Sequence, residues 1–164
     1  MKLLLMRHGI AENSGPGITD AQRRLTGEGQ RLTRLALQGL SQIVEAPAAI
    51  VTSPLTRAVE TATIAAELFA VTPQAMPELA GHDAAPIIAA LTGRKEPVLL
   101  AVGHEPTLSA IVERLCTAAA CGFVEFGRAG CACVEADWGA KTAHPGKLLW
   151  FATPHMLREL AKKR

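Results

Sequence analysis

The chain has 164 residues, of which 49% are hydrophobic and 20% are charged, and its formal net charge is +2. This composition predicts one globular domain, residues 1–164, with enough apolar residues for a core. Aromatic residues make up 4% of the chain, and tyrosine is absent. A near-neutral chain with so few aromatic side chains argues against a nucleic-acid partner. The apolar run after Lys2 ends at Arg7, too soon for a signal peptide or membrane span, so we expect a cytoplasmic protein without a membrane partner.

Strand and helix signals alternate along the chain, which predicts an α/β fold. Strands are expected at residues 2–6, 48–52, 71–76, 98–102, 129–136 and 147–151, with 71–76 as a short edge strand. Helices are expected at residues 26–45, from 53 onward, at 84–92, after residue 106 and from 154 to the end. No repeat or linker interrupts this order, so the chain is expected to form one unit.

Two of the expected helices have clear start signals. Thr26 is a candidate cap for the first helix, and Ser53 with Pro54 is a candidate cap and first residue for the second. Apolar residues then recur at helical spacing and predict the buried face of each helix. They are Leu32, Ala36, Leu40, Ile43 and Val44 in the first helix, and Leu55, Val59, Ala62, Ala66 and Phe69 in the second.

The cysteines do not have the spacing of a metal site or of a disulfide framework. No two of them are separated by two residues, and Cys131 and Cys133 lie on the same face of one expected strand. We therefore expect all four, Cys116, Cys121, Cys131 and Cys133, to be buried or half-buried free thiols. Three histidines, His82, His144 and His155, are expected at the surface or in loops.

Polar residues follow three of the expected strands. Arg7 and His8 follow the first strand, Ser53 and Arg57 follow the second, and His104 follows the strand at 98–102. Ligands of open α/β sheets bind beyond the carboxyl ends of the strands, so these side chains are expected to meet in one pocket. Arg57 falls in the first turn of its helix, where the helix dipole is positive and an arginine is favourable only beside an anion. The pattern therefore predicts a phosphate site.

Imidazole and guanidinium groups at one phosphate site indicate phosphoryl transfer. A neutral imidazole is a nucleophile toward phosphorus, and neighbouring arginines lower its pKa and keep it unprotonated. The same arginines neutralise negative charge on the phosphoryl oxygens. This chemistry requires no metal ion or other cofactor, and the chain has neither a P-loop nor an aspartate-rich magnesium motif.

Four motifs resemble, in the same order, those of the histidine phosphatase superfamily, which is also called phosphoglycerate mutase-like. They are Met6-Arg7-His8-Gly9, Ser53-Pro54-Leu55-Thr56-Arg57-Ala58-Val59-Glu60-Thr61, Pro77-Glu78-Leu79 and Val102-Gly103-His104-Glu105-Pro106. The resemblance spans nearly the whole chain and is greatest to the short phosphohistidine phosphatases of the SixA type. It implies a three-layer α/β/α sandwich with a mostly parallel central sheet and a minimal lid.

The resemblance also implies a role for each residue of the motifs. His8 would be the nucleophile that becomes transiently phosphorylated, and Arg7, Arg57 and His104 would hold the phosphoryl group. Glu78 would be the general acid that protonates the leaving group. Ser53 is either a helix cap or a further phosphate contact. Other acidic residues are alternative candidates for the acid: Glu12, Asp20, Asp83 and Glu105.

The short segment between Glu78 and His104 indicates the kind of substrate. Only about 25 residues separate the two, which leaves room for one small helix but not for a large lid. An open pocket suits a phosphorylated side chain on a protein, such as a histidine-containing phosphotransfer domain, better than a small metabolite. The alternatives are a phosphatase of small phosphate esters and a catalytically weak module that binds phosphoproteins. The oligomeric state is left open by the sequence.

Overall fold

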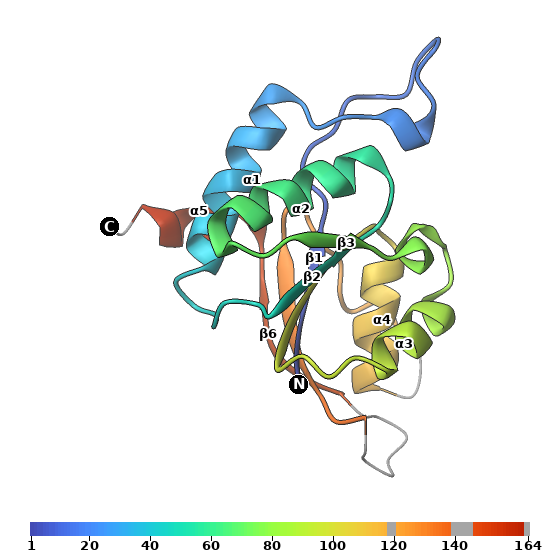
Figure 1. Ribbon diagram of the computed structural model, residues 1–164, viewed down its shortest axis with the longest axis vertical. Coiled ribbons are helices and arrows are strands. Elements are labelled where there is room, and N and C mark those ends of the chain that lie inside the picture. The colour runs from blue at the N-terminus through green and yellow to red at the C-terminus, as the bar shows by residue number, and fades with distance from the viewer. Residues whose placement is uncertain (118–120, 139–145, 163–164) are drawn as a thin grey trace.

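A six-stranded sheet forms the centre of the computed structural model, which describes residues 1–117, 121–138 and 146–162 (Figure 1). The described strands are β1 (Lys2–Arg7), β2 (Ala49–Thr52), β3 (Pro73–Ala75), β4 (Val98–Gly103), β5 (Cys131–Ala136) and β6 (Gly146–Ala152). Their order across the sheet is β3-β2-β4-β1-β5-β6. The first four strands are parallel, whereas β5 is antiparallel to both of its neighbours. The expected mostly parallel sheet, with a short strand at one edge, is confirmed.

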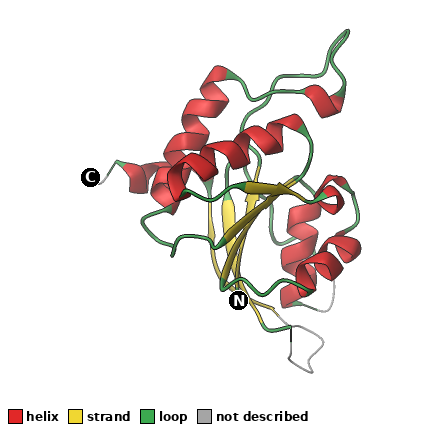
Figure 2. Cartoon of the chain, viewed as in Figure 1, coloured by secondary structure: helices red, strands yellow, loops and turns green. Residues whose placement is uncertain are grey.

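Helices cover both faces of this sheet, which confirms the three layers (Figure 2). The described helices are α1 (Gly27–Leu40), α2 (Thr56–Phe69), α3 (Ala84–Thr92), α4 (Thr107–Cys116) and α5 (Pro154–Ala161), with 3-10 turns η1 (Asp20–Gln22) and η2 (Pro77–Ala80). Apolar residues of α1, α2 and α5 form one core with the sheet, and those of α3 and α4 form the other. The lid is minimal, because α3 lies against α4 rather than over the carboxyl ends of the strands (Figure 1).

Strand β1 contributes side chains to both cores. Leu4 and Met6 point into the core under α1, α2 and α5, whereas Leu3 and Leu5 point into the core under α3 and α4. All four side chains are buried. Strands of a parallel sheet that is covered on both faces are continuously apolar, and this explains the run that precedes Arg7.

Helix α1 is shorter than expected, and its buried face is rotated. Thr26 caps it as expected, because its hydroxyl accepts the backbone N–H of Gly29, but the helix ends at Leu40. Its larger buried side chains are those of Thr33, Ala36, Leu37 and Leu40, while Leu32 and Val44 are only partly buried and Ile43 is 43% exposed. The reason is the close approach of α5: a Cβ atom on Gly39 would collide with the carbonyl oxygen of Leu157.

Helix α2 begins at Thr56, three residues after the expected cap. Leu55 occupies the cap position, so the assignments of Ser53 as cap and of Pro54 as first helical residue were wrong. Its buried residues are Arg57, Ala58, Thr61, Ala62, Ile64 and Ala65, and Val59 is 38% exposed. The helix therefore turns a polar side, with Arg57 and Thr61, toward the carboxyl ends of the strands.

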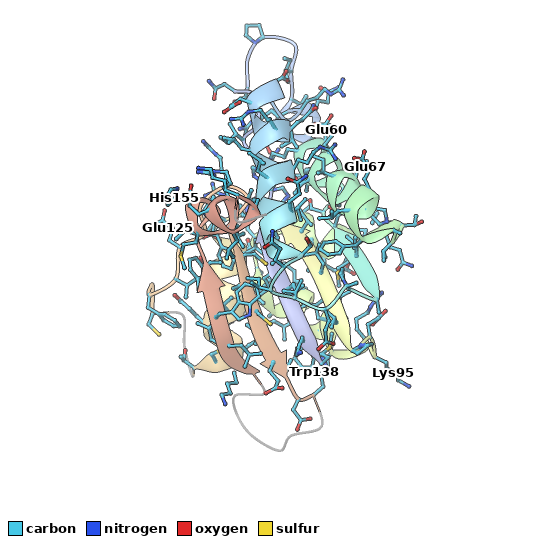
Figure 3. The ribbon with its side chains drawn as sticks, turned by 90° about the vertical axis from the view of Figure 1, so that its left-hand side faces the viewer. Glu60, Glu67, Lys95, Glu125, Trp138 and His155 are labelled. Atoms are coloured by element: carbon cyan, nitrogen blue, oxygen red, sulfur yellow. The ribbon has the colours of Figure 1, made fainter. Side chains whose placement is uncertain are left out.

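Salt bridges join α1 and the segment before it to the exposed side of α2. Arg34 pairs with Glu67 at 2.7 Å, and Arg24 pairs with Glu60 at 2.7 Å. The other carboxylate oxygen of Glu60 accepts the backbone N–H of Leu25 at 2.6 Å. Figure 3 shows Glu60 and Glu67 on α2, beside α1. Glu60 thus holds the end of the long β1–α1 segment against α2.

The cysteines and surface histidines lie mostly as expected. Cys131 and Cys133 are buried thiols on one face of β5, and Cys116 is half-buried, but Cys121 is exposed. His82 and His155 are exposed, the latter on α5 (Figure 3), and His144 lies outside the described residues. No helix in the described part of the chain has the length and hydropathy to cross a membrane.

Candidate active site

Three neighbouring strands bring the expected site residues to one edge of the sheet. β2, β4 and β1 are adjacent, and Ser53, His104 and His8 directly follow them in that order. The backbone N–H of His8 donates to the carbonyl of Gly103 at 3.1 Å, and that of Ser53 donates to the carbonyl of Val102 at 3.0 Å. The parallel pairing therefore continues beyond the strands and places the two imidazole rings 5.1 Å apart.

The protonation of the His8 ring follows from its hydrogen bonds. Nδ1 lies 2.7 Å from the carbonyl oxygen of Gly9, which can only accept, so Nδ1 carries the proton. Nε2 is therefore the nitrogen with the lone pair, and it accepts from Nε of Arg57 at 3.2 Å. The histidine is 7% exposed, and its unprotonated nitrogen faces a buried guanidinium.

Arg57 lies in the first turn of α2 and uses all three sides of its guanidinium group. Besides the contact of Nε with His8, Nη1 donates to the backbone carbonyl of Asp20 at 2.6 Å and Nη2 donates to the carboxylate of Asp20 at 3.0 Å. The arginine is 6% exposed. An anion was expected beside Arg57. In this structure the anion is the carboxylate of Asp20, a residue of η1.

The described residues hold Arg7 from one side. Its Nη1 donates to the backbone carbonyl of Phe126 at 2.6 Å, while its buried Nε has no hydrogen-bond partner among the described residues. Burial lowers the pKa of Arg7, and the nearby carboxylate of Glu105 opposes this shift. A buried guanidinium donor without a partner costs free energy, so this nitrogen is suited to an anionic ligand.

Ser53 is paired with His104 and does not cap α2. Nε2 of His104 lies 2.7 Å from the hydroxyl oxygen of Ser53, and the buried Nδ1 has no partner among the described residues. The backbone N–H of Leu55 also donates to the Ser53 hydroxyl, at 3.3 Å. Ser53 therefore orients the second imidazole.

Both imidazoles are neutral at physiological pH. Burial, followed by the charges of His104, Arg57 and Arg7, lowers the pKa of His8 to about 3 against the opposing hydrogen bond to Gly9. Burial and the nearby arginines lower the pKa of His104 to about 4. The arginines were expected to cause the shift of His8, but desolvation is the larger cause.

Two supporting contacts were not identified from the sequence. The hydroxyl of Thr61 accepts the backbone N–H of Gly9 at 3.0 Å and donates to the carbonyl of Arg57 at 2.8 Å, which links the end of β1 to α2. Gly9 itself packs on α1, because a Cβ atom there would collide with the hydroxyl of Thr33. The available signal was the position of Thr61 one helical turn after Arg57.

The acidic candidates differ in their relation to the cluster of Arg7, His8, Arg57 and His104. Glu78 is exposed on η2, and no contact of its carboxylate with the site is found among the described residues. Asp83 caps α3 and pairs with Arg114, and the carboxylate of Glu105 is hydrogen-bonded to Ser109. Glu12 is exposed. Of these five, Asp20 alone contacts one of the four cluster residues directly, through Arg57.

The sequence of residues 3–85 matches the family model of the histidine phosphatase superfamily, branch 1. The chain belongs to this superfamily. The match includes the segments that carry His8, Arg57 and Glu78, and membership supports phosphatase activity. An uncharacterised protein of Picosynechococcus sp. is 37% identical to this histidine phosphatase over 121 residues, which are 70% of this chain and 73% of the relative.

Solved structures share the fold of this histidine phosphatase. The protein histidine phosphatase SixA in complex with tungstate has a TM-score of 0.80 and 26% identity, over 94% of this chain and 98% of SixA. A mycobacterial glucosyl-3-phosphoglycerate phosphatase with inorganic phosphate has a TM-score of 0.72 and 17% identity, over 93% and 98% of the two chains. The chain is therefore a histidine phosphatase of the SixA type, and its fold is shared with a phosphatase of a small phosphate ester.

Proposed function

We propose that this protein hydrolyses phosphohistidine on a protein, without a metal ion, through a phosphorylated His8. The observation that carries the proposal is the state of the His8 ring. Its proton is fixed on Nδ1 by Gly9, and its Nε2 lone pair faces Arg57 in a buried site. An imidazole held in this way is prepared for attack on phosphorus.

In the first step, Nε2 of His8 forms a bond to phosphorus as the bond between phosphorus and the leaving group breaks. The contact of Arg57 Nε with Nε2 is then replaced by a contact with a phosphoryl oxygen. The unpartnered Nε of Arg7 and the second imidazole, His104, supply further donors. These groups would donate hydrogen bonds to the phosphoryl oxygens, where negative charge is concentrated during transfer.

In the second step, water attacks the phosphorus of phosphorylated His8 and releases inorganic phosphate. The bond from phosphorus to Nε2 breaks, and its electron pair returns to the ring as the original lone pair. Gly9 keeps the proton of the ring on Nδ1 through both steps. The site is thereby restored without a change of tautomer.

The minimal lid supports a protein substrate. α3 lies beside α4, so the segment between Glu78 and His104 does not enclose the site (Figure 1). A phosphorylated side chain on a protein surface can enter such a site, whereas a small metabolite gains more from enclosure. The likeness to SixA, a protein histidine phosphatase, favours the same class. We infer a phosphorylated histidine-containing phosphotransfer domain as the type of partner.

A radiolabelled phosphotransfer domain tests the proposal. The wild-type protein should release inorganic phosphate from it, and His8→Ala should lose at least about a thousandfold in rate, as expected for removal of a nucleophile. His155→Ala, which alters an exposed histidine on α5, serves as the matched control and should keep full activity. A phosphoenzyme trapped in the wild type and absent from His8→Ala would support the intermediate. Equal release by His8→Ala and the wild type would contradict it.

The same assay distinguishes the two alternatives. Rapid hydrolysis of sugar or glycerate phosphates with an inert phosphohistidine substrate would assign the protein to the phosphatases of small esters, as the mycobacterial relative suggests. That chemistry requires a proton for an alkoxide leaving group, and the exposed Glu78 would have to supply it. Binding of the phosphorylated domain without release of phosphate would instead indicate a binding module.

A further inference from the structure

The guanidinium group of Arg57 bridges the carboxylate of Asp20 and Nε2 of His8. Arg57 donates from Nη1 and Nη2 to the carbonyl and the carboxylate of Asp20, and from Nε to His8 Nε2. Asp20 also contributes a charge that raises the pKa of His104 against the larger effect of burial. The charge of this aspartate therefore acts on His104, and its contact with Arg57 links it to His8.

Asp20 faces solvent at this position. Its side chain is 60% exposed, whereas the side chain of Arg57 beneath it is 8% exposed. In phosphoryl transfer the leaving group departs roughly in line with the attacking atom, on its opposite side. Because His8 is buried, the leaving group departs toward solvent, to which the side chain of Asp20 is also exposed.

Asp20 is an anion and has no proton to give at neutral pH. Arg23 donates to one carboxylate oxygen at 2.8 Å and Arg57 to the other at 3.0 Å, and these two bonds hold the pKa of Asp20 below its usual value. Each oxygen retains a further lone pair for another donor. Asp20, which contacts Arg57 directly, is therefore not suited to protonate an alkoxide, but it can accept an N–H group.

A phosphohistidine substrate presents such an N–H group. Its ring carries the phosphoryl group on one nitrogen and, when protonated, a hydrogen on the other. As His8 attacks, the bond between phosphorus and the substrate nitrogen breaks, its electron pair returns to the substrate ring, and the ring leaves as neutral imidazole with its N–H hydrogen retained. No proton from the enzyme is needed. The protonated ring is the better leaving group, because an unprotonated ring would leave as an anion.

We propose that Asp20 accepts the N–H of the protonated phosphohistidine ring and thereby selects imidazole leaving groups over alkoxides. This role rests on the proposed phosphohistidine phosphatase activity and gives it a residue for specificity. A carboxylate beside the ring favours its protonated form. The benefit is greatest above the ordinary imidazole pKa of about 6.5, where little free phosphohistidine is protonated.

Asp20→Asn tests the proposal with two substrates, a phosphohistidine-bearing phosphotransfer domain and p-nitrophenyl phosphate, whose leaving group needs no proton. At about pH 8, kcat/KM for phosphohistidine should fall roughly tenfold to a hundredfold, and the loss should shrink at about pH 6. The value for p-nitrophenyl phosphate should change less than about threefold. Asp20→Glu, which keeps a carboxylate, should recover part of the phosphohistidine activity.

Glu12→Gln is the matched control, since Glu12 is an exposed acid in the same β1–α1 segment and its carboxylate forms no hydrogen bond with the described residues of the cluster. It should leave both activities unchanged. A loss in Asp20→Asn that is equal for the two substrates at every pH would mean that Asp20 only positions Arg57, and would overturn the proposal. An unchanged phosphohistidine activity would also overturn it. A wild-type protein that cleaves p-nitrophenyl phosphate but not phosphohistidine would instead overturn the proposed function.

Discussion

The guanidinium of Arg7 is held by the backbone carbonyl of Phe126, 119 positions away in the sequence, through a hydrogen bond of 2.6 Å from Nη1. The segment that leads to Phe126 is in turn fixed by Glu113, a side chain of α4 with 2% exposure. The carboxylate of Glu113 accepts the backbone N–H groups of Cys121, Gly122, Phe123 and Val124 at 2.7–3.2 Å. A buried carboxylate on α4 thereby orders the loop that holds Arg7.

Glu113→Gln should therefore destabilise the protein. Burial alone would raise the pKa of Glu113, but the four backbone donors outweigh it and lower the pKa, so the carboxylate is charged in the folded state. An amide cannot accept four N–H bonds, and we expect a loss of about 2–4 kcal/mol in the free energy of unfolding measured with urea. Glu135→Gln, at an exposed position of β5, should change it by less than about 0.5 kcal/mol. Similar losses in both variants would contradict this account.

Thr61→Val should separate the end of β1 from α2 with little change in side-chain shape. The substitution removes the hydroxyl that links the N–H of Gly9 to the carbonyl of Arg57. The free energy of unfolding should fall by about 1–2 kcal/mol, because the N–H of Gly9 is left buried without a partner. Activity should fall as well, since Arg57 is then less firmly aligned with His8. Thr63→Val, which removes a hydroxyl bonded to the carbonyl of Val59 on the exposed side of α2, is the control and should retain activity.

Gly9→Ala should be destabilising because of Thr33 rather than because of the backbone. The added methyl group would collide with the hydroxyl of Thr33, and the φ angle of Gly9 is not in the left-handed region. We expect a loss of about 1–3 kcal/mol. Thr33→Ala removes the colliding atom, so the double variant should recover most of this loss relative to Thr33→Ala alone. A loss of the same size in both backgrounds would assign the requirement for glycine to another cause.

Folding stability should decrease on acidification because His8 is buried in its neutral form. Its pKa is about 3 in the folded protein, against about 6.5 in an unfolded chain. Between these values the unfolded state binds a proton that the folded state does not. The free energy of unfolding therefore keeps the whole contribution of neutral His8 above about pH 6.5 and loses it as the pH falls. His8 alone should lower the free energy of unfolding by about 1.4 kcal/mol for each pH unit of acidification in this range.

Urea unfolding at several values between about pH 7 and pH 4.5 measures this slope. His8→Gln should show a shallower decline than the wild type. His155→Gln, which changes an exposed histidine, should show the wild-type slope. Identical slopes for the two variants would mean that the His8 imidazole is not the group that resists protonation.

The succession of strands and helices along the chain and the identity of the four cluster residues could be predicted from the sequence for a simple reason. Apolar runs such as residues 3–6 and 98–102 form parallel strands, and such strands deliver the residues that follow them to one edge of a sheet. Arg7 is the last residue of β1, His8 and His104 directly follow strands, and Arg57 lies in the first turn of α2. Their convergence depends on their position after parallel strands, which the local sequence pattern indicates.

Only the tertiary structure decided the contacts that set the chemistry of these residues. Ser53 has the residue type and position of a helix cap, yet its hydroxyl binds His104, because β2 and β4 are neighbours in the sheet. Asp20 was one of several acidic residues, and its contact with Arg57 arises from the path of a loop rather than from any periodic pattern. Hydrogen bonds between residues far apart in the sequence depend on how loops and helices pack, and spacing along the chain carries no record of that packing. The sequence alone therefore indicated which groups come together beyond the strands, while the packing around them determined which nitrogen of His8 carries the lone pair and which carboxylate contacts Arg57.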